Sequence, residues 1–213
     1  MHADKLVDRL VSDLTPVSRP RMWRDIGLLI LLVAIELGLY VGFGRVRADL
    51  ELAMAQPVWW WKIGSTSALA MLATIIAVRS FVPAQDAPLA RKSLAPLIIL
   101  VIIAGWGINA LTVTTVPMLD RLHWQTGLQC IVGVLGRSIV PMLAIGVMMR
   151  RGASTNPALS ANAAGLAAAG WGSAIFAFHC PHDDVLYVSV WYATAMLLLV
   201  GTARLVLPRL TRW

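Results

Sequence analysis

Long apolar segments recur along the chain and are separated by short polar ones. Six of them approach the length of about 20 residues that a helix needs to cross a bilayer core of about 30 Å. These segments are residues 26–44, 58–78, 94–111, 127–149, 158–178 and 185–207. The pattern predicts an all-α, polytopic membrane protein. Its six-helix transmembrane bundle would occupy residues 25–207, between an N-terminal segment 1–24 and a short tail 208–213. The fifth segment is rich in Ala and Gly, which favours close packing among other helices.

The N-terminal segment carries a second apolar pattern, with helical spacing. Apolar residues recur every three or four positions and charged residues occupy the other faces; the apolar set is Leu6, Val7, Leu10, Val11 and Leu14. This pattern predicts an amphipathic helix of about three turns that ends at Thr15–Pro16. Such a short helix is marginal in water, and its acidic residues fit an anionic membrane surface poorly. We therefore expect the apolar stripe to bind a groove on a protein partner.

The composition agrees with a membrane protein. Of the 213 residues, 58% are apolar and 14% are charged, whereas soluble domains contain about 25% charged residues. A soluble globule of this size has too little interior to bury that much apolar surface. This excludes an ordinary soluble enzyme, a disordered regulator and a small secreted disulfide-rich domain. The first apolar segment is too long for a signal peptide and follows a polar stretch, so we expect it to be a membrane span.

The basic residues predict the orientation in the membrane. The net charge of +7 suggests nucleic-acid binding, but the cations are dispersed over the N-terminal segment, two loops and the C-terminal end. The opposite side has only Arg45, Arg47 and Arg121 outside the predicted spans. Because basic residues concentrate on the cytoplasmic side of membrane proteins, both termini are expected in the cytoplasm. The expected surroundings are a lipid bilayer, with no direct nucleic-acid partner.

The two cysteines of the chain, Cys130 and Cys180, fall on the non-cytoplasmic side in this topology. Cys130 lies near the outer end of the fourth span, and Cys180 lies just past the outer end of the fifth. In a bacterium that side is the periplasm, where disulfides form and persist. The sequence leaves two interpretations open: a reactive thiol pair for redox sensing, or two buried thiols that pack as small hydrophobic residues.

Cys180 belongs to the densest polar cluster on the outer side, residues 179–184. Imidazoles and thiolates are ligands for soft or borderline metals, and carboxylates can complete or orient such a site. The candidate metal ligands are Cys130, Cys180, His179, His182, Asp183 and Asp184. His123 lies on the same side. However, the spacing matches no closed zinc motif. The alternative is a Pro-containing turn in which Asp183 or Asp184 caps the last helix.

Two ionisable residues fall near the middle of predicted spans. Glu36 lies in the first span and Arg137 in the fourth. An isolated charge is costly at that depth, so we expect both to face the bundle interior and to form an intramembrane ion pair. A path for protons or ions is the alternative. Lys62 is expected near the outer interface, where its long side chain can reach water.

Several motifs resemble the negative regulator of sigma F family, whose members are six-span bacterial membrane anti-sigma factors. The most specific is the run from Phe178 to Trp191; the others are residues 5–10 (KLVDRL), the Arg19–Pro20 step, residues 105–107 (GWG) and Cys130. The resemblance covers nearly the whole chain, and Tyr192 departs from it where a histidine is expected. It implies a multi-pass protein of the bacterial inner membrane that partners a sigma factor of the extracytoplasmic-function class. It also implies that Cys130 and Cys180 take part in signal response.

The residues and the resemblance together predict a membrane-bound anti-sigma factor, which is a transcription regulator and not an enzyme. Its N-terminal helix would sequester the sigma factor, and a heavy metal or an oxidant acting at the two cysteines would trigger a stress response by releasing it. No resident cofactor is expected, although a thiol-bound metal ion would serve as a signal. Two alternatives remain open. One is a membrane thiol oxidoreductase, which usually needs a Cys-x-x-Cys pair that this chain lacks; the other is a small ion or metal transporter that uses Glu36 and Arg137.

Overall fold

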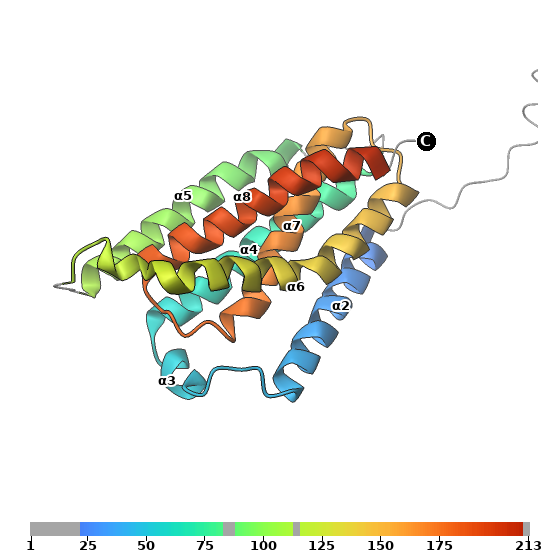
Figure 1. Cartoon of the computed structure of the whole chain (residues 1–213). Coiled ribbons are helices and arrows are strands. Elements are labelled where there is room, and N and C mark those ends of the chain that lie inside the picture. The colour runs from blue at the N-terminus through green and yellow to red at the C-terminus, as the bar shows by residue number, and fades with distance from the viewer. Residues whose placement is uncertain (1–21, 83–87, 113–115, 211–213) are drawn as a thin grey trace, which may run out of the picture.

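The computed structural model describes residues 22–82, 88–112 and 116–210 (Figure 1). This part of the chain is helical and contains no strand. Its elements are α2 (Met22–Gly42), α3 (Leu50–Met54), α4 (Pro57–Ser80), α5 (Pro88–Leu111), the short 3-10 helix η1 (Asp120–Leu122), α6 (Trp124–Arg151), α7 (Pro157–Ala177) and α8 (Val185–Leu210). The predicted N-terminal amphipathic helix lies outside the described residues.

The six long helices coincide with the six apolar segments of the sequence. Helix α5 begins at Pro88 rather than at residue 94, and α8 continues to Leu210 rather than ending at residue 207. Five of the six, all except α7, are long and apolar enough to cross a membrane. The prediction of an all-helical fold is confirmed. Helix α8 includes residues 208–210, so it extends into the segment predicted as a short C-terminal tail.

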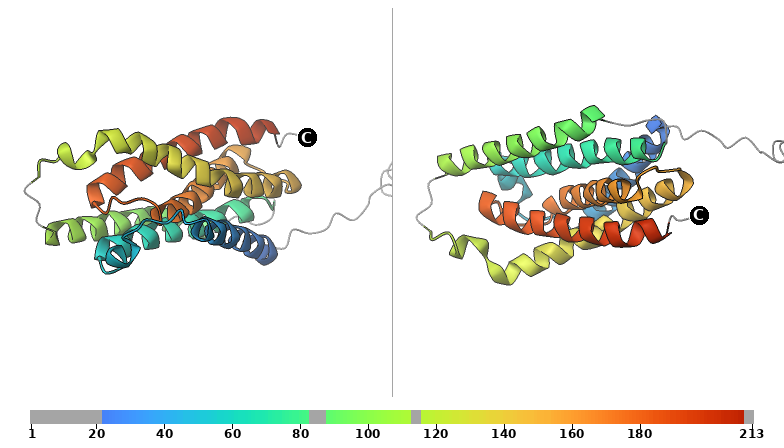
Figure 2. Two further views of the ribbon diagram at one scale, coloured as in Figure 1. Left: turned by 60° about the horizontal axis from the view of Figure 1, so that its bottom comes forward. Right: turned by 90° about the horizontal axis from the view of Figure 1, so that it is seen from above.

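Helix α7 runs through the centre of the bundle, which accounts for its weaker hydropathy. It packs against α4, α6 and α8 (Figures 1 and 2), and most of its residues from Ser160 to Ala177 are buried. A Cβ atom at Gly170 would come within 2.8 Å of the Cβ of Ala70 on α4. The small residues of α7 therefore allow close approach of its neighbours, as the Ala- and Gly-rich pattern predicted. Its surface contacts protein, so it does not need the apolar side chains that contact lipid.

Helices α2 and α5 lie at the edge of the bundle. Helix α2 buries only Ile26, Leu29 and Val33, and its C-terminal end diverges from α6 (Figure 1). Helix α5 packs beside α4. Only 6% of the 18-residue apolar stretch that makes it a candidate membrane span is buried inside the structure. Contiguous apolar surface of this extent is unusual on a soluble monomer. It is the surface expected of helices that contact lipid.

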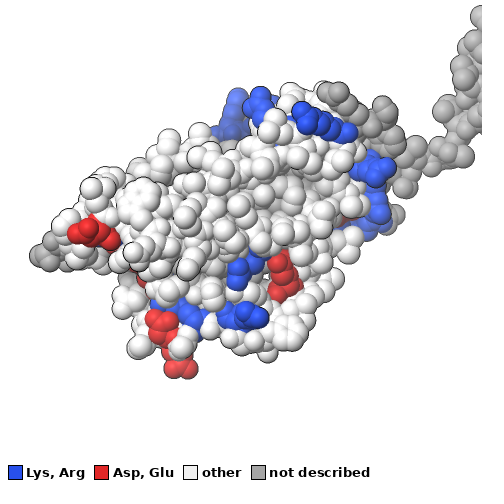
Figure 3. All heavy atoms as spheres, viewed as in Figure 1, with Lys and Arg blue, Asp and Glu red and all other residues white. Residues whose placement is uncertain are grey.

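Three connections meet at one end of the bundle. They are residues 43–56 between α2 and α4, residues 116–123 ahead of α6, and residues 178–184 between α7 and α8. The backbone N–H of Arg47 donates to the carbonyl oxygen of Phe178 at 3.0 Å, which joins the first connection to the third. Figure 3 shows one group of Lys and Arg toward the opposite end, where α2 begins and α8 ends, and a second group in the lower part of the view, where Asp and Glu lie beside it. The end with the three connections holds the candidate site.

Candidate functional site

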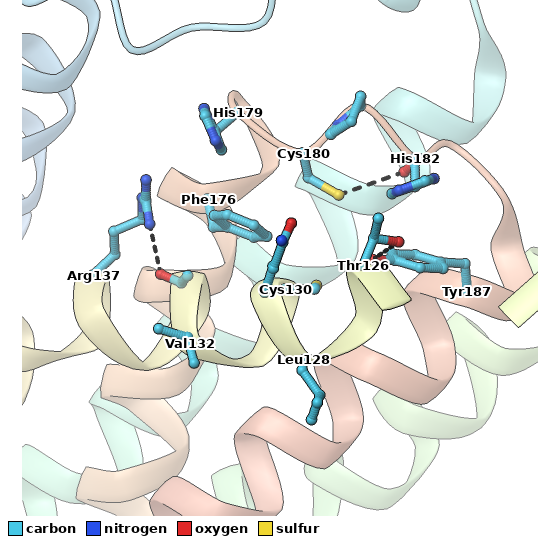
Figure 4. A pocket seen from close by; sticks show the side chains of 13 residues that line it. Thr126, Leu128, Cys130, Val132, Arg137, Phe176, His179, Cys180, His182 and Tyr187 are labelled. Atoms are coloured by element: carbon cyan, nitrogen blue, oxygen red, sulfur yellow. Dashed lines mark hydrogen bonds between the residues drawn. The ribbon is translucent and has the colours of Figure 1, made fainter. Parts of the chain in front are cut away.

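A pocket of about 520 Å³ lies between the first half of α6 and the connection from α7 to α8 (Figure 4). Thiol, imidazole, guanidinium and aromatic side chains border it together with apolar ones. The lining residues are Thr126, Leu128, Gln129, Cys130, Val132, Gly133, Arg137, Phe176, His179, Cys180, Pro181, His182 and Tyr187. The fold therefore brings both cysteines, two of the predicted histidines and the predicted mid-span arginine to one pocket.

Cys130 and Cys180 are both free thiols and both buried, with exposed fractions of 2% and 1%. They belong to one apolar cluster, and the Sγ of Cys180 donates to the carbonyl oxygen of His182 at 3.8 Å. The Cys130 thiol, as a hydrogen-bond donor, lowers the pKa of Cys180; burial opposes this effect, and the charge of Lys62 adds to it. Thiolates, not thiols, are the nucleophiles and metal ligands. The surroundings of Cys180 therefore favour its thiolate form.

The imidazoles of the polar cluster have different partners. His182 stacks on His123, with ring centroids 5.1 Å apart, and contacts the ring of Tyr187 in a tilted arrangement, with centroids 4.3 Å apart. Burial lowers the pKa of His182, and the neighbouring His123 acts in the same direction. In contrast, the Nδ1 atom of His179 lies 2.9 Å from the carbonyl oxygen of Arg45. His182 thus connects the site to the segment ahead of α6, and His179 connects it to the segment after α2.

The two carboxylates of the cluster are engaged in ion pairs. Asp183 binds Nζ of Lys62 at 2.7 Å and Nη1 of Arg47 at 2.6 Å. Asp184 binds Arg121 at 2.8 Å. Its other oxygen accepts two backbone N–H groups from the first turn of α8, at 2.8 and 3.1 Å. The expected helix cap is therefore confirmed for Asp184.

The predicted metal ligands do not converge. Among the residues that the structure describes, no group of three or more His, Cys, Asp and Glu side chains could hold a metal ion. Cations already bind both aspartates, and His179 contacts a different segment from His182. A preformed metal site is thus absent from this part of the chain for the set Cys130, Cys180, His179, His182, Asp183 and Asp184.

Lys62 reaches the connection from α7 to α8 but not water, so the expectation that its side chain extends into water is wrong. Its side chain is fully buried, and Nζ donates to the carbonyl oxygens of Cys180 at 3.3 Å and His182 at 3.1 Å as well as to Asp183. A buried ammonium requires a counter-ion and further acceptors, and this segment supplies both. The sequence signal was a lone lysine within an apolar span. Its partner could not be identified because Asp183 lies 121 positions away.

Arg47 is a second site residue that sequence reasoning missed, since it was counted only as an outer cation. Its guanidinium donates to the carbonyl oxygens of Cys180 at 3.1 Å and Pro181 at 3.3 Å. It also binds both carboxylate oxygens of Asp49 at 2.7 Å. The hydrogen bonds to Asp49 raise the pKa of Arg47 and lower that of Asp49 to about 2. Arg47 therefore ties the Cys180 segment to the connection that follows α2.

The ion pair predicted between Glu36 and Arg137 is not formed as a direct contact. The two residues attract each other across α2 and α6, but no ion pair within 4.0 Å joins them among the described residues. Arg137 instead binds the Tyr40 hydroxyl and, at 2.8 Å, the carbonyl oxygen of Gly133. Its guanidinium also stacks on the rings of Tyr40 and Phe176, 4.4 and 4.9 Å from their centroids. Aromatic faces attract the cation there, so Arg137 joins α2 to the thiol pocket.

Comparison with known proteins identifies the family. The chain is 29% identical over 203 residues to the anti-sigma-F factor NrsF of Caulobacter vibrioides, an alignment that covers 93% of this chain and 94% of that protein. It is 27% identical over 173 residues to the probable anti-sigma-F factor NrsF of Azospira oryzae, which covers 79% of each. No solved structure matches the chain. Residues 10–213 match the family described as Negative regulator of sigma F, and the chain belongs to this family.

Proposed function

We propose that the protein is a membrane-bound anti-sigma factor with a thiol sensor on the periplasmic side. Its N-terminal segment binds a sigma factor of the extracytoplasmic-function class and keeps it from RNA polymerase. Reaction of Cys130 and Cys180 with an oxidant or a soft metal ion then releases the sigma factor. Membership of the family supports the anti-sigma role, since the two relatives are named as anti-sigma-F factors. The role is regulatory and requires no substrate turnover.

The observation that carries the sensor is the meeting of both thiols in one pocket. A two-electron oxidant would join the two sulfurs in a disulfide, and both thiol protons would leave as the oxidant is reduced. A soft metal ion would bind the two sulfurs and displace the same protons. The thiols are buried, but they border a pocket of about 520 Å³ that a small reagent could enter. Both reactions change how the Cys180 segment packs.

Helix α2 is the route by which this change would reach the N-terminal segment. The connection after α2 is bound to residues 178–183 through the Arg47 contacts and through the contact between His179 and Arg45. Farther along α2, the hydroxyl of Tyr40 binds Arg137 in the pocket. The other end of α2 begins at Met22, so its first residues overlap the end of the predicted sigma-binding segment 1–24. Movement of the Cys180 segment would therefore shift α2 and weaken sigma binding.

The energies are compatible with such a switch. Moving a two-state equilibrium from about 1:99 to 99:1 takes about 5.5 kcal/mol. A disulfide contributes about 2–4 kcal/mol, which moves the equilibrium only part of that way, whereas binding of a metal by thiolates can contribute more. Little buried surface opposes the movement, because α2 buries only Ile26, Leu29 and Val33.

In this proposal the six long helices cross the bacterial inner membrane and both termini face the cytoplasm. Five of these helices have the length and apolarity of membrane spans, and α7 would be shielded from lipid by its neighbours. The Lys and Arg side chains gathered where α2 begins and α8 ends support this orientation (Figure 3). The thiol pocket would then face the periplasm.

The sensor is tested with the double variant Cys130→Ser and Cys180→Ser. We expect this protein to capture the sigma factor normally but to keep it bound when cells are treated with diamide or cadmium. The measurement is co-purification of the sigma factor, together with a reporter of sigma-dependent transcription. A normal response in the double variant would exclude the thiol mechanism.

The sigma-binding segment is tested separately with Leu10→Asp, which places a charge in the apolar stripe of the N-terminal helix. We expect capture of the sigma factor to be lost, whereas Asp8→Asn on a polar face should retain it. Deletion of residues 1–20 should match Leu10→Asp. Intact capture in Leu10→Asp would show that the apolar stripe is not the binding surface.

A further inference from the structure

A groove of about 420 Å³ lies between α2 and α6, at the end of the bundle where α2 begins and α6 ends. It shares no lining residue with the thiol pocket. The two helices meet beside it through an apolar cluster that includes Leu29 and Val33 of α2 and Ile145 and Met149 of α6. The groove therefore follows the line along which α2 packs against α6, and α2 separates from α6 farther along (Figure 1).

Two rows of side chains form the sides of the groove. Each row consists of residues four positions apart, which lie on one face of a helix. The rows are Arg24, Leu28 and Leu32 on α2, and Leu143, Val147 and Arg151 on α6. Each row is about 12 Å long, at about 1.5 Å per residue. Leu28 and Leu143 are 51% and 65% exposed, so the aliphatic part of the groove is open to the surroundings of the bundle.

The two arginines lie at the same end of the groove, because Arg24 is in the first turn of α2 and Arg151 is the last residue of α6. The Nε atom of Arg24 lies 3.6 Å from Oδ1 of Asp25, but the Arg24 side chain is 61% exposed, so water weakens this ion pair. Neither guanidinium donates a hydrogen bond to another residue that the structure describes. Two arginines and one aspartate leave a net positive charge at the mouth of the groove. A guanidinium can bind two phosphate oxygens at once.

We propose that this groove binds an anionic phospholipid, whose phosphate binds Arg24 and Arg151 and whose acyl chain lies along the two aliphatic rows. Basic pockets between membrane helices recognise lipid headgroups in this way. A soluble anion would use the arginines but leave the aliphatic rows uncovered. A zwitterionic headgroup would bring its own cation toward the arginines, which disfavours it. The site places the lipid on the helix that leads into the predicted sigma-binding segment.

The inference requires the long helices to lie in a membrane, but it does not depend on the thiol sensor. The experiment uses the full chain in vesicles of phosphatidylcholine. One preparation contains a small fraction of phosphatidylglycerol with a diazirine on one acyl chain, and the other contains phosphatidylcholine with the same diazirine chain. After illumination, the cross-linked residues are identified by mass spectrometry. The exposed face of α5, which includes Leu100 and Ile103, reports the lipid that surrounds the bundle without selection.

The labelling of residues 28–32 and 140–147, divided by that of the α5 face, should be about tenfold higher with the phosphatidylglycerol probe than with the phosphatidylcholine probe. The double variant Arg24→Gln and Arg151→Gln should lower it to the phosphatidylcholine value. The matched control is Arg204→Gln with Arg209→Gln, which removes the same charge from α8 outside the groove; it should keep the parent ratio. All four arginines are exposed, so these variants should fold normally.

Equal ratios for the two probes, or equal losses in the two double variants, would overturn the inference. Glycerol phosphate, which has the headgroup phosphate but no acyl chain, is added as a competitor. If it removed the labelling at concentrations as low as those of the lipid, the site would be one for a soluble anion, and a phospholipid site would be rejected. A groove that neither probe labels, or that is labelled only after deletion of residues 1–20, would be covered by protein, and this result would also reject it.

Discussion

Replacing Asp183 with Asn is expected to loosen the Cys180 segment from the bundle. The carboxylate of Asp183 neutralises two cations, since Nζ of Lys62 and Nη1 of Arg47 lie 2.7 and 2.6 Å from its oxygens. The side chain of Lys62 is 0% exposed and that of Asp183 is 18% exposed. Water therefore screens the pair weakly, and Asp183→Asn leaves a buried ammonium without its counter-ion.

The magnitude follows from this burial. Breaking a buried ion pair by removing one partner costs about 3–5 kcal/mol. Lys62 keeps two carbonyl acceptors and the new amide can accept a hydrogen bond, so we expect the lower end, about 3 kcal/mol. This loss applies to the local equilibrium in which residues 178–184 detach from the bundle. Each 1.36 kcal/mol changes an equilibrium constant tenfold, so the population of the detached form should rise more than about 100-fold.

The assay is alkylation of Cys180 by a maleimide too bulky for the closed pocket, at about pH 9.5, where an ordinary thiol is mostly ionised. Under these conditions the rate follows the open population, so Asp183→Asn should react about 100-fold faster than the parent. Asp49→Asn is the matched control: Asp49 also binds Arg47 at 2.7 Å, but its side chain is 51% exposed, and exposed ion pairs stabilise proteins little. Equal rates in the two variants would refute the argument that burial makes the Asp183 pair strong.

Three further predictions concern packing, pH and the α2 contact. Gly172→Leu should destabilise the fold by about 1–3 kcal/mol in thermal unfolding, because even its Cβ would lie 2.8 Å from the α6 backbone; Gly136→Leu, with open space around it, should not. The pKa of His182 is lowered in the folded chain. Its contribution to stability is therefore complete above about pH 6.5 and is lost as the pH falls below that value. Cys180 should become more accessible to alkylation on acidification, and His182→Gln should remove this pH dependence. Tyr40→Phe should lower the unfolding temperature through a loss of about 1.5–3 kcal/mol, since it removes a hydroxyl bound to Arg137 and keeps the ring; an unchanged unfolding temperature would show that the hydroxyl contact is not stabilising.

The helices could be predicted from the sequence because the length of an apolar segment and the spacing of its apolar residues are properties of neighbouring residues. Each of the six segments formed a helix near its expected position. The small residues of α7 also predicted its close packing, since few other side chains allow a helix to approach three neighbours. The ends were less predictable: α5 extends upstream and α8 extends downstream, because helix termini depend on local hydrogen bonds more than on hydropathy.

The site was predictable in composition but not in pairing. Topology alone placed Cys130 and Cys180 at one end of the bundle, and the structure brings them to one pocket. The partners of the charged groups could not be deduced, since each pairing joins residues far apart in sequence. Asp183 binds a lysine 121 positions away, and Arg137 binds the hydroxyl of Tyr40 97 positions away instead of pairing with Glu36. Depth in the membrane can be estimated by counting residues along a span, whereas the direction of a side chain around the helix depends on how the helices pack.

The pairing of Asp183 also favours one direction for the proposed signal. One of its oxygens binds Lys62 on α4 and the other binds Arg47 on the connection after α2, so a displaced Cys180 segment cannot keep both contacts unless one partner moves with it. Helix α4 is held by α7 and α5, whereas α2 has few buried side chains. Moving α2 therefore disrupts less packing than moving α4. In the proposed mechanism, the strain of a disulfide or a bound metal at Cys180 would be relieved at α2, the helix that leads into the sigma-binding segment.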